Sequence, residues 1–187
     1  MLARRSGASA PPPPKASNDF LTLPWFSEAM SNYIRPQIAG ACVFFTVTLA
    51  NRHSQLLTRE IAALRAAVRR TKAERPFAID AWVVLPDHMH CVWTLPDGDR
   101  DFSTRWSVIK ARFSRAMPPT PRRPSHAARR EHGIWQRRFW EHHLRSEADK
   151  TAAIRYCWIN PVKHGLADRP EAWPYSSIHR DGPADWP

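Results

Sequence analysis

Two histidines separated by one residue are the first groups in this sequence that could do chemistry. His88 and His90 stand in the run AWVVLPDHMHCVWTL, residues 81–95. Side chains alternate between the faces of an extended strand, so both imidazoles point one way while Met89, Cys91 and Trp93 point the other. Two neutral imidazoles on one face can hold a divalent metal and leave most of its coordination sphere open, as a catalytic ion requires. The same tripeptide also occurs in strands that only pack or face water.

A tyrosine and an asparagine four residues apart form the second group. Tyr156 and Asn160 lie in RYCWINPVKHGL, where we expect a helix to end, and this spacing puts both on one helix face. The amide oxygen of Asn160, just before Pro161, is then free to bind a cation. Ionising a free phenol at neutral pH costs roughly 4 kcal/mol, which a divalent ion and nearby cations can offset. A core aromatic followed by a helix cap is the alternative interpretation.

Elimination favours Tyr156 as a nucleophile. The sequence has only three tyrosines, and Tyr33 and Tyr175 stand in the N-terminal lead and the tail. Tyr156 alone has a polar group at helical spacing and a neighbouring cation, Arg155 or Lys163. We therefore expect any tyrosine chemistry to use this residue.

The positive charge is concentrated in one quarter of the chain. The formal net charge is +11, and residues 102–145 hold eleven Lys and Arg against Glu131 and Glu141. Such a patch binds polyanions, and nucleic acid is favoured over a membrane surface because no basic amphipathic helix has a wide apolar face. A plainly solvated surface is the alternative for the helical part. The candidate DNA-binding residues are Arg105, Lys110, Arg112, Arg115, Arg122, Arg123, Arg129, Arg130, Arg137, Arg138 and Lys163.

The cysteines and the apolar runs bear on location. Cys42, Cys91 and Cys157 each lie in an apolar segment, which is typical of core residues in a reducing cytosol rather than of a disulfide or zinc framework. No run approaches the length of a membrane span. The N-terminus lacks the hydrophobic region of a signal peptide. We expect a cytoplasmic protein with no membrane partner and no small-molecule cofactor.

Hydrophobic periodicity predicts the elements that must position these groups. Strands are expected over 43–49, 82–85, 91–95 and 134–144, and helices over 58–74, from a cap at Asp101 or Ser103 to about 117, and from 146 to 159 with a stop near Pro161. This order predicts an α+β fold with an antiparallel four- to five-stranded sheet and helices packed mainly on one face, ferredoxin-like or RRM-like.

The composition divides the chain into three parts. Residues 1–30 are rich in Pro, Ala and Ser and read as a disordered tail, and Met30 could be the true translation start. Residues 31–180 form the expected catalytic domain, with a mobile basic loop over 118–132, and 181–187 form a short tail.

Several strings together resemble one family. LPDHMHCVW, VIKARFSR, WQRRFWEHH, RYCWINPVKHGL and WPYSS occur in the order seen in REP-associated tyrosine transposases, over about Tyr33 to Arg180. These are relatives of the small single-strand transposases of bacterial insertion sequences, within the His-hydrophobic-His (HUH) endonuclease group. Trp158 and Ile159 depart from residues common in the family, which leaves the pocket lining open.

The resemblance implies a specific chemistry. His88, His90 and Asn160 would bind Mg²⁺ or Mn²⁺, and Tyr156 would cleave single-stranded DNA, forming a 5′-phosphotyrosine and freeing a 3′-hydroxyl. A second strand's 3′-hydroxyl could reverse the reaction and rejoin DNA. The targets would be short palindromic repeats that fold into hairpins, gripped by the basic helix and the 118–132 loop, in a bacterial, nucleoid-associated protein that is a monomer or a homodimer.

Two other functions are compatible with the residues. A non-catalytic single-stranded nucleic-acid-binding domain of the same fold could use Trp135 and Trp140 to stack bases. A hydrolytic metallonuclease could recruit His142 or His143 as extra ligands, leaving a free 5′-phosphate and no protein–DNA adduct.

Overall fold

A computed structural model of the chain describes residues 37–118 and 133–182. The expected N-terminal tail with Met30, most of the 118–132 loop and the last residues lie outside the described residues. The elements are β1 (Cys42–Thr48), α1 (Leu56–Arg59), α2 (Ile61–Glu74), β2 (Ala78–Val84), β3 (His88–Thr94), α3 (Phe102–Ala116), β4 (Trp140–His143), α5 (Glu147–Lys163), the 3₁₀ helix η3 (Pro170–Ala172) and α6 (Ile178–Asp181).

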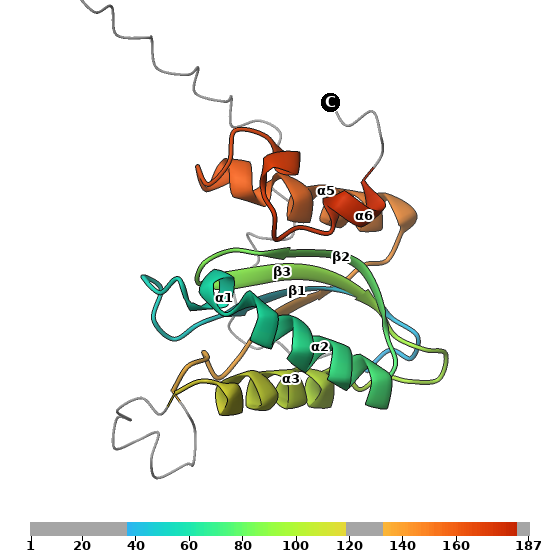
Figure 1. Cartoon of the computed structure of the whole chain (residues 1–187). Coiled ribbons are helices and arrows are strands. Elements are labelled where there is room, and N and C mark those ends of the chain that lie inside the picture. Colours follow the sequence, from blue (N-terminus) through green and yellow to red (C-terminus); the bar gives the residue numbers. More distant parts are fainter. Residues whose placement is uncertain (1–36, 119–132, 183–187) are drawn as a thin grey trace, which may run out of the picture.

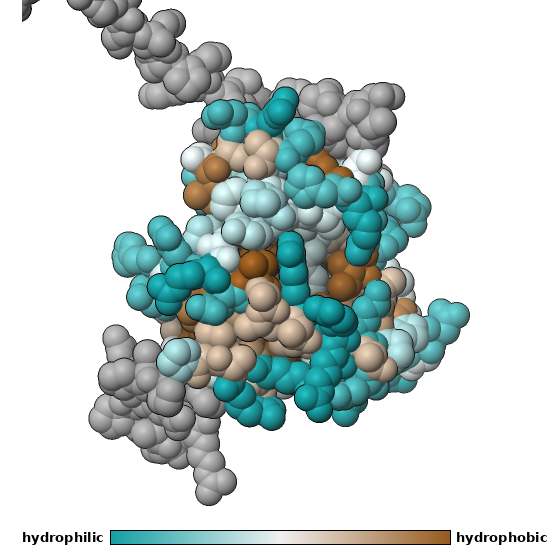
Figure 2. Space-filling model, in the orientation of Figure 1, coloured by the Kyte–Doolittle hydropathy of each residue, from teal (hydrophilic) through white to brown (hydrophobic). Residues whose placement is uncertain are grey.

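Four strands form one antiparallel sheet in the order β2-β3-β1-β4. This order, with α2 and α3 as the connecting helices, is the ferredoxin-like arrangement, so the predicted α+β class is confirmed. The helices α1, α2 and α3 lie on one face of the sheet, and α5 with α6 adds a layer on the other (Figure 1). On the α2 side, hydrophilic side chains alternate with exposed apolar surface (Figure 2).

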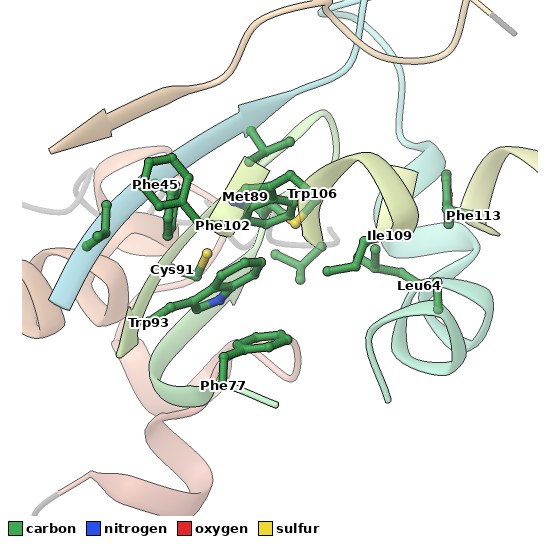
Figure 3. Packing of buried hydrophobic residues seen from close by; sticks show 14 of the residues in the cluster. Phe45, Leu64, Phe77, Met89, Cys91, Trp93, Phe102, Trp106, Ile109 and Phe113 are labelled. Atoms are coloured by element: carbon green, nitrogen blue, oxygen red, sulfur yellow. The ribbon is translucent and has the colours of Figure 1, made fainter. Parts of the chain in front are cut away.

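The larger core lies between the sheet and the helices α2 and α3 (Figure 3). Met89, Cys91 and Trp93 of β3 point into it and are fully buried, as the alternation predicts. Trp93 stacks on Trp106 of α3 with 4.2 Å between ring centroids. A smaller core around Phe44 lies on the α5 side. The hydrophobic free energy of this fold is therefore concentrated on one face of the sheet.

The predicted hairpin is confirmed with adjusted ends. Leu85 N donates to the carbonyl of His88 (2.8 Å), which closes the Pro86-Asp87 turn. The strand after the turn begins at His88, three residues earlier than the apolar run suggested, so both histidines lie inside β3. The predicted helix over 58–74 is divided at Glu60 into α1 and α2.

The predicted strand over 134–144 is wrong for its first half. Only Trp140–His143 forms β4, and upstream of it Trp135 makes an isolated bridge with Leu49. This bridge is formed by Gln136 N, which donates to the Thr48 carbonyl (2.9 Å), and Ala50 N, which donates to the Ile134 carbonyl (2.9 Å). The same segment also contacts α3, because the Trp135 indole N–H donates to the Lys110 carbonyl (3.3 Å) and Lys110 Nζ donates to the Gln136 carbonyl (3.0 Å).

The predicted stop at Pro161 is also wrong. The helix begins where expected, with Ser146 accepting from Asp149 N (3.1 Å), but α5 runs through Pro161 to Lys163. A proline removes one backbone donor and bends a helix without always ending it. The helix ends instead before Gly165, whose φ of +65° is a left-handed cap conformation. The extra turn brings His164 to the active-site end of α5.

Candidate active site

The face of β3 opposite the large core carries both histidines. The ring centroids of His88 and His90 are 5.0 Å apart, and the residues are 5% and 3% exposed. The strand alternation therefore does bring the pair together on one face, against α5. A buried pair of this kind needs hydrogen-bond partners, and each ring has one.

Each imidazole is held at its Nδ1 atom. His88 Nδ1 lies 2.7 Å from Asp87 Oδ1, and the other Asp87 oxygen is paired with Arg52 (2.7 Å). His90 Nδ1 lies 2.9 Å from Thr46 Oγ1, on the neighbouring strand β1. When these Nδ1 atoms carry the proton and donate, the Nε2 atom of each ring keeps a lone pair, as in histidines that bind metal and are oriented by a second polar group.

Burial sets the protonation of the pair. It lowers the pKa of His88 despite the opposing effect of Asp87, and it lowers the pKa of His90 well below its usual value, helped by the neighbouring His88. Both rings are therefore neutral at pH 7. Neutral imidazole is the form that binds metals.

Helix α5 brings the tyrosine to the pair. The Tyr156 and His90 ring centroids are 5.3 Å apart, and Phe44 of β1 contacts both rings, at 5.7 and 5.5 Å. Burial raises the pKa of the Tyr156 phenol, with a hydrogen bond to the Asn160 side chain acting in the opposite direction. The phenol is thus protonated at neutral pH, beside the histidines rather than in the large core.

Asn160 offers an oxygen atom without a protein partner. Its Nδ2 donates to the Tyr156 carbonyl (3.2 Å), while its buried Oδ1 accepts nothing from the described residues. An unsatisfied buried carbonyl oxygen is costly in a dry protein, and a bound cation would satisfy it. Two neutral imidazoles and this amide oxygen are a donor set that fits a small divalent ion.

The described residues contain no group of three or more His, Cys, Asp or Glu that could hold a metal. Such a group would be needed if His142 or His143 joined the histidine pair. The side chain of His143 lies instead on the α3 side, 5.8 Å from Phe102 between ring centroids. His143 is therefore not placed to join the histidine pair.

Sequence reasoning missed three polar residues of this site. Asp87 and Thr46 orient the imidazoles, and the His164 ring lies 5.1 Å from that of His88. His164 follows Asn160 by four residues, so helical spacing would have placed it here had the helix been extended through Pro161. Lys163, one of the two cations expected beside the tyrosine, lies with Nζ 4.7 Å from the centre of the Tyr156 ring.

Apart from Arg105, the predicted DNA-binding residues separate into three groups. Arg115, Arg137 and Arg138 are exposed, as is Lys163. Lys110 and Arg112 make structural contacts, Lys110 to Gln136 and Arg112 to Thr71 and Glu74 of α2. The remaining four, Arg122, Arg123, Arg129 and Arg130, lie outside the described residues.

Arg105 requires a correction. It is 3% exposed, and its guanidinium donates to the carbonyls of Arg75, Pro76 and Asp101 and to Asp99 Oδ2 (2.6 Å). The side chain fastens the α2–β2 connection to α3, so its place is structural and we exclude it from the DNA-binding residues. Because it follows Phe102 by three residues, Arg105 lies next to the buried side of α3, which includes Phe102 and Trp106.

The three cysteines lie in or beside the cores, as their apolar surroundings in the sequence predict. Cys91 and Cys157 are buried, Cys42 is half-buried, and all are free thiols. Within the described residues, every helix is too short or too polar to cross a membrane.

Comparisons with known proteins place this chain among the DNA transposases. It is 49% identical over 162 residues to the REP-associated tyrosine transposase of Escherichia coli K12, covering 84% of this chain and 91% of that protein. A Haemophilus influenzae relative of the same family name is 40% identical, with 84% and 93% covered. A solved REP-associated tyrosine transposase bound to a REP hairpin is 48% identical, with a TM-score of 0.72 over 84% of this chain and 92% of that one. No family model matches the sequence.

The chain therefore belongs to the REP-associated tyrosine transposase family. The resemblance drawn from the sequence motifs is confirmed, and so is the fold.

Proposed function

We propose that this protein is a metal-dependent tyrosine transposase that cleaves and rejoins single-stranded DNA at hairpin-forming palindromic repeats. The observation that carries the proposal is the 5.3 Å separation between the Tyr156 and His90 rings, with the free Asn160 oxygen one helical turn away. The relative whose structure was solved with a REP hairpin supports the substrate. The domain is then the expected catalytic domain, 31–180.

His88, His90 and Asn160 would hold Mg²⁺ or Mn²⁺. A divalent ion there would supply Lewis-acid stabilisation of the charge that develops on the scissile phosphate. The neutral state of both imidazoles supports this assignment, and so do the contacts of Asp87 and Thr46 with the Nδ1 atoms, which orient the rings.

Tyr156 is the proposed nucleophile. Its phenolic oxygen forms a bond to the phosphorus atom while the bond from phosphorus to the 3′-oxygen breaks; the phenol loses its proton and the 3′-oxygen gains one. The 5′-phosphotyrosine ester keeps the phosphodiester energy, so another 3′-hydroxyl can reverse the step and join strands. Lys163, near the phenol ring, stabilises the negative charge that develops there.

The exposed basic residues Arg115, Arg137 and Arg138 are the proposed phosphate contacts, together with Lys163 near the tyrosine. Arg122, Arg123, Arg129 and Arg130 belong to the same proposal from the basic loop. The protein acts in the bacterial cytoplasm, where its DNA substrate lies.

A denaturing gel tests the chemistry directly. The protein is incubated with a labelled hairpin oligonucleotide carrying single-stranded flanks, with Mg²⁺ or Mn²⁺, and the covalent adduct is quantified. Tyr156→Phe is expected to abolish the adduct while hairpin binding survives, and His88→Ala is expected to abolish it without rescue by excess metal. Tyr33→Phe is the matched control and keeps the adduct.

Two results would overturn the proposal. Hairpin binding by the wild type with no adduct under either metal would identify a binding domain. Cleavage that leaves a free 5′-phosphate, unaffected by Tyr156→Phe, would identify a hydrolytic nuclease.

A further inference from the structure

A second concave site lies on the sheet face opposite the histidines. It is a cleft of about 410 Å³ between α2 and the edge strand β2, within the size range of ligand clefts. Its floor is formed by Ile79, Trp82 and Val84 of β2. Its second wall is formed by Tyr175, Ser176, Ser177 and Arg180. Figure 2 shows apolar surface in the hollow between α2 and the C-terminal layer, crossed by hydrophilic side chains.

The local backbone explains the floor. A register shift between Ile79 and Ala81 inserts Asp80 into the ladder, so that Ile79 and Trp82 face the same side of the sheet. Val84 N donates to the Tyr175 carbonyl (2.9 Å) and Ser177 N to the Trp82 carbonyl (2.7 Å), which fixes the C-terminal segment along the edge of β2. The cleft is therefore framed by hydrogen-bonded backbone on the β2 side.

The rim of the cleft is strongly basic. Arg65, Arg69 and Lys72 follow one another at four- and three-residue spacing on the exposed side of α2, and no acidic side chain lines the cleft. Within the described part of the chain, these three side chains have no ion-pair partner, whereas Arg70 on the same helix is paired with Glu74 (3.2 Å). Unpaired cations at this spacing suit a chain of phosphates better than a single anion.

Aromatic side chains complete the site. Trp82 is half-buried in the floor, with an indole N–H that finds no acceptor among the described residues, and Tyr175 stands in the opposite wall. An apolar, aromatic floor beneath a line of cations is the combination by which proteins hold single-stranded nucleic acid, because bases stack while phosphates contact the rim. A paired stem fits less well, since its base faces are already stacked.

We propose that this cleft binds an unpaired nucleotide in the single-stranded DNA that flanks the hairpin. The base lies against Trp82 and Tyr175, and the adjoining phosphates contact Arg65, Arg69 and Lys72. The inference rests on the proposed function and adds a second contact site for the same substrate.

The cleft is connected to the helix that carries the nucleophile. The Ser177 hydroxyl accepts from the Trp158 indole of α5 (3.1 Å) and from Trp82 N on the cleft floor (2.9 Å). A DNA strand that leaves the tyrosine and passes around the β2 edge therefore reaches a surface held rigidly to α5. Such a contact would fix the position of the flank relative to the scissile phosphate.

Binding assays with two oligonucleotides test the cleft. One is a bare hairpin and the other carries single-stranded extensions on both sides. Arg65→Gln/Arg69→Gln is expected to weaken binding of the extended hairpin and to lower its salt-dependence slope by about 1.4, at about 0.7 per single-strand phosphate contact. The bare hairpin is expected to bind as it does to the wild type. Arg75→Gln/Arg100→Gln removes the same charge from exposed residues outside the cleft and is the matched control.

The base contact has its own test. Tyr175→Leu is expected to weaken binding of the extended hairpin about 5- to 100-fold, and one abasic position in the extension should reproduce that loss in the wild type. Photocrosslinking of 5-iodouracil at that position should label residues 61–72 or 175–180.

The outcomes separate this inference from the proposed function. Equal losses for the cleft variant and the charge-matched control, or crosslinks only elsewhere, would overturn the cleft while adduct formation through Tyr156 stands. Absence of the adduct in the wild type would overturn the proposed function, whichever way the cleft variants behave. Loss confined to the extended hairpin, with the adduct intact at saturating DNA, supports both.

Discussion

One strand, β3, serves two faces of the sheet that differ in kind. Met89, Cys91 and Trp93 point into an aromatic core in which apolar groups are fully buried. His88 and His90 alternate with them and point towards α5, where polar atoms are buried beside the smaller apolar cluster around Phe44. Packing on the first face stabilises the fold. On the second face, the desolvation of two imidazoles and an amide lowers the free energy of unfolding.

The two faces of the sheet therefore have different roles, stability on the α2–α3 side and the proposed metal binding on the α5 side. The α2–α3 face can be rigid because it makes no proposed contact with the reacting atoms. On the α5 face, the lone pairs that a metal would use are left without protein partners, most clearly at Asn160 Oδ1. Substitutions on the first face should therefore change stability, and those on the second should change metal binding and chemistry.

The largest expected effect is on the core face. Trp106→Ala removes a fully buried indole stacked on Trp93 and should lower the free energy of unfolding by about 3–5 kcal/mol, through lost burial and a cavity. Urea denaturation measures it, with Trp106→Phe as the smaller change. A loss under about 1 kcal/mol would contradict the assignment of stability to this face.

Asn160→Leu is the matching change on the other face. It replaces a buried, unpartnered oxygen with an apolar group of similar size, so the unfolding free energy should stay within about 1 kcal/mol of the wild type or rise. Mn²⁺ affinity, measured by calorimetry, should fall by about 100-fold or more, which exceeds the loss typical of changing a residue that only orients a ligand. Asn160→Asp keeps a donor oxygen and should retain binding; full Mn²⁺ affinity in the leucine variant would remove Asn160 from the ligands.

The sequence alone predicts which side chains lie together where the periodicity of a single strand or helix determines the face on which they lie. The two-residue alternation of β3 put the histidines on one face, and the four-residue spacing of α5 put Tyr156 beside Asn160. It was insufficient where distant segments meet. Thr46 reaches His90 only through the β1–β3 register, across 44 residues, and no local pattern specifies that register.

The remaining errors came from tertiary contacts that override local signals. The charged side of the helix predicts Arg105 as a DNA contact, with a solvated surface as the alternative, but backbone carbonyls from the α2–β2 connection satisfy its guanidinium in the interior. The pattern predicts one long strand over 134–144, but only an isolated bridge at Trp135 and the short β4 pair with β1 and its end, and bonds to Lys110 hold residues 135–136 to α3 as well. In both cases polar groups found partners from another element, which propensity and periodicity do not encode.

Thr46→Val tests whether metal binding at the histidine pair depends on the hydroxyl that orients His90. The change keeps the side-chain shape and removes the hydroxyl that contacts His90 Nδ1 (2.9 Å). Mn²⁺ affinity is expected to fall about 10- to 100-fold with little change in stability. Thr94→Val, which removes a hydroxyl bound instead to Asp80, is the control and should leave metal binding unchanged. Equal losses in both variants would show a general effect of the sheet.

The smallest expected effect concerns the partly buried Lys110 on the α3 side, whose charge should lower the free energy of unfolding. Burial lowers the pKa of Lys110 to about 8. Below about pH 8 the Lys110 side chain is charged in both states, and the charge is less favourable in the folded protein than in the unfolded chain, so it lowers the free energy of unfolding. This destabilisation decreases as pH rises from about 8 towards 10.5, because the folded protein loses the proton at a lower pH than the unfolded chain does. Lys110→Met should therefore raise the unfolding free energy at pH 7 by about 1 kcal/mol, after the lost bond to the Gln136 carbonyl is subtracted.

Urea denaturation at pH 7 and pH 10 measures the difference in unfolding free energy between Lys110→Met and the wild type, which should be smaller at pH 10. The exposed control Lys72→Met should give the same difference at both pH values. A Lys110→Met protein that is less stable at pH 7 than at pH 10, relative to the wild type, would mean that the hydrogen bond to Gln136 outweighs desolvation and that the core side, like the histidine side, depends on a polar contact.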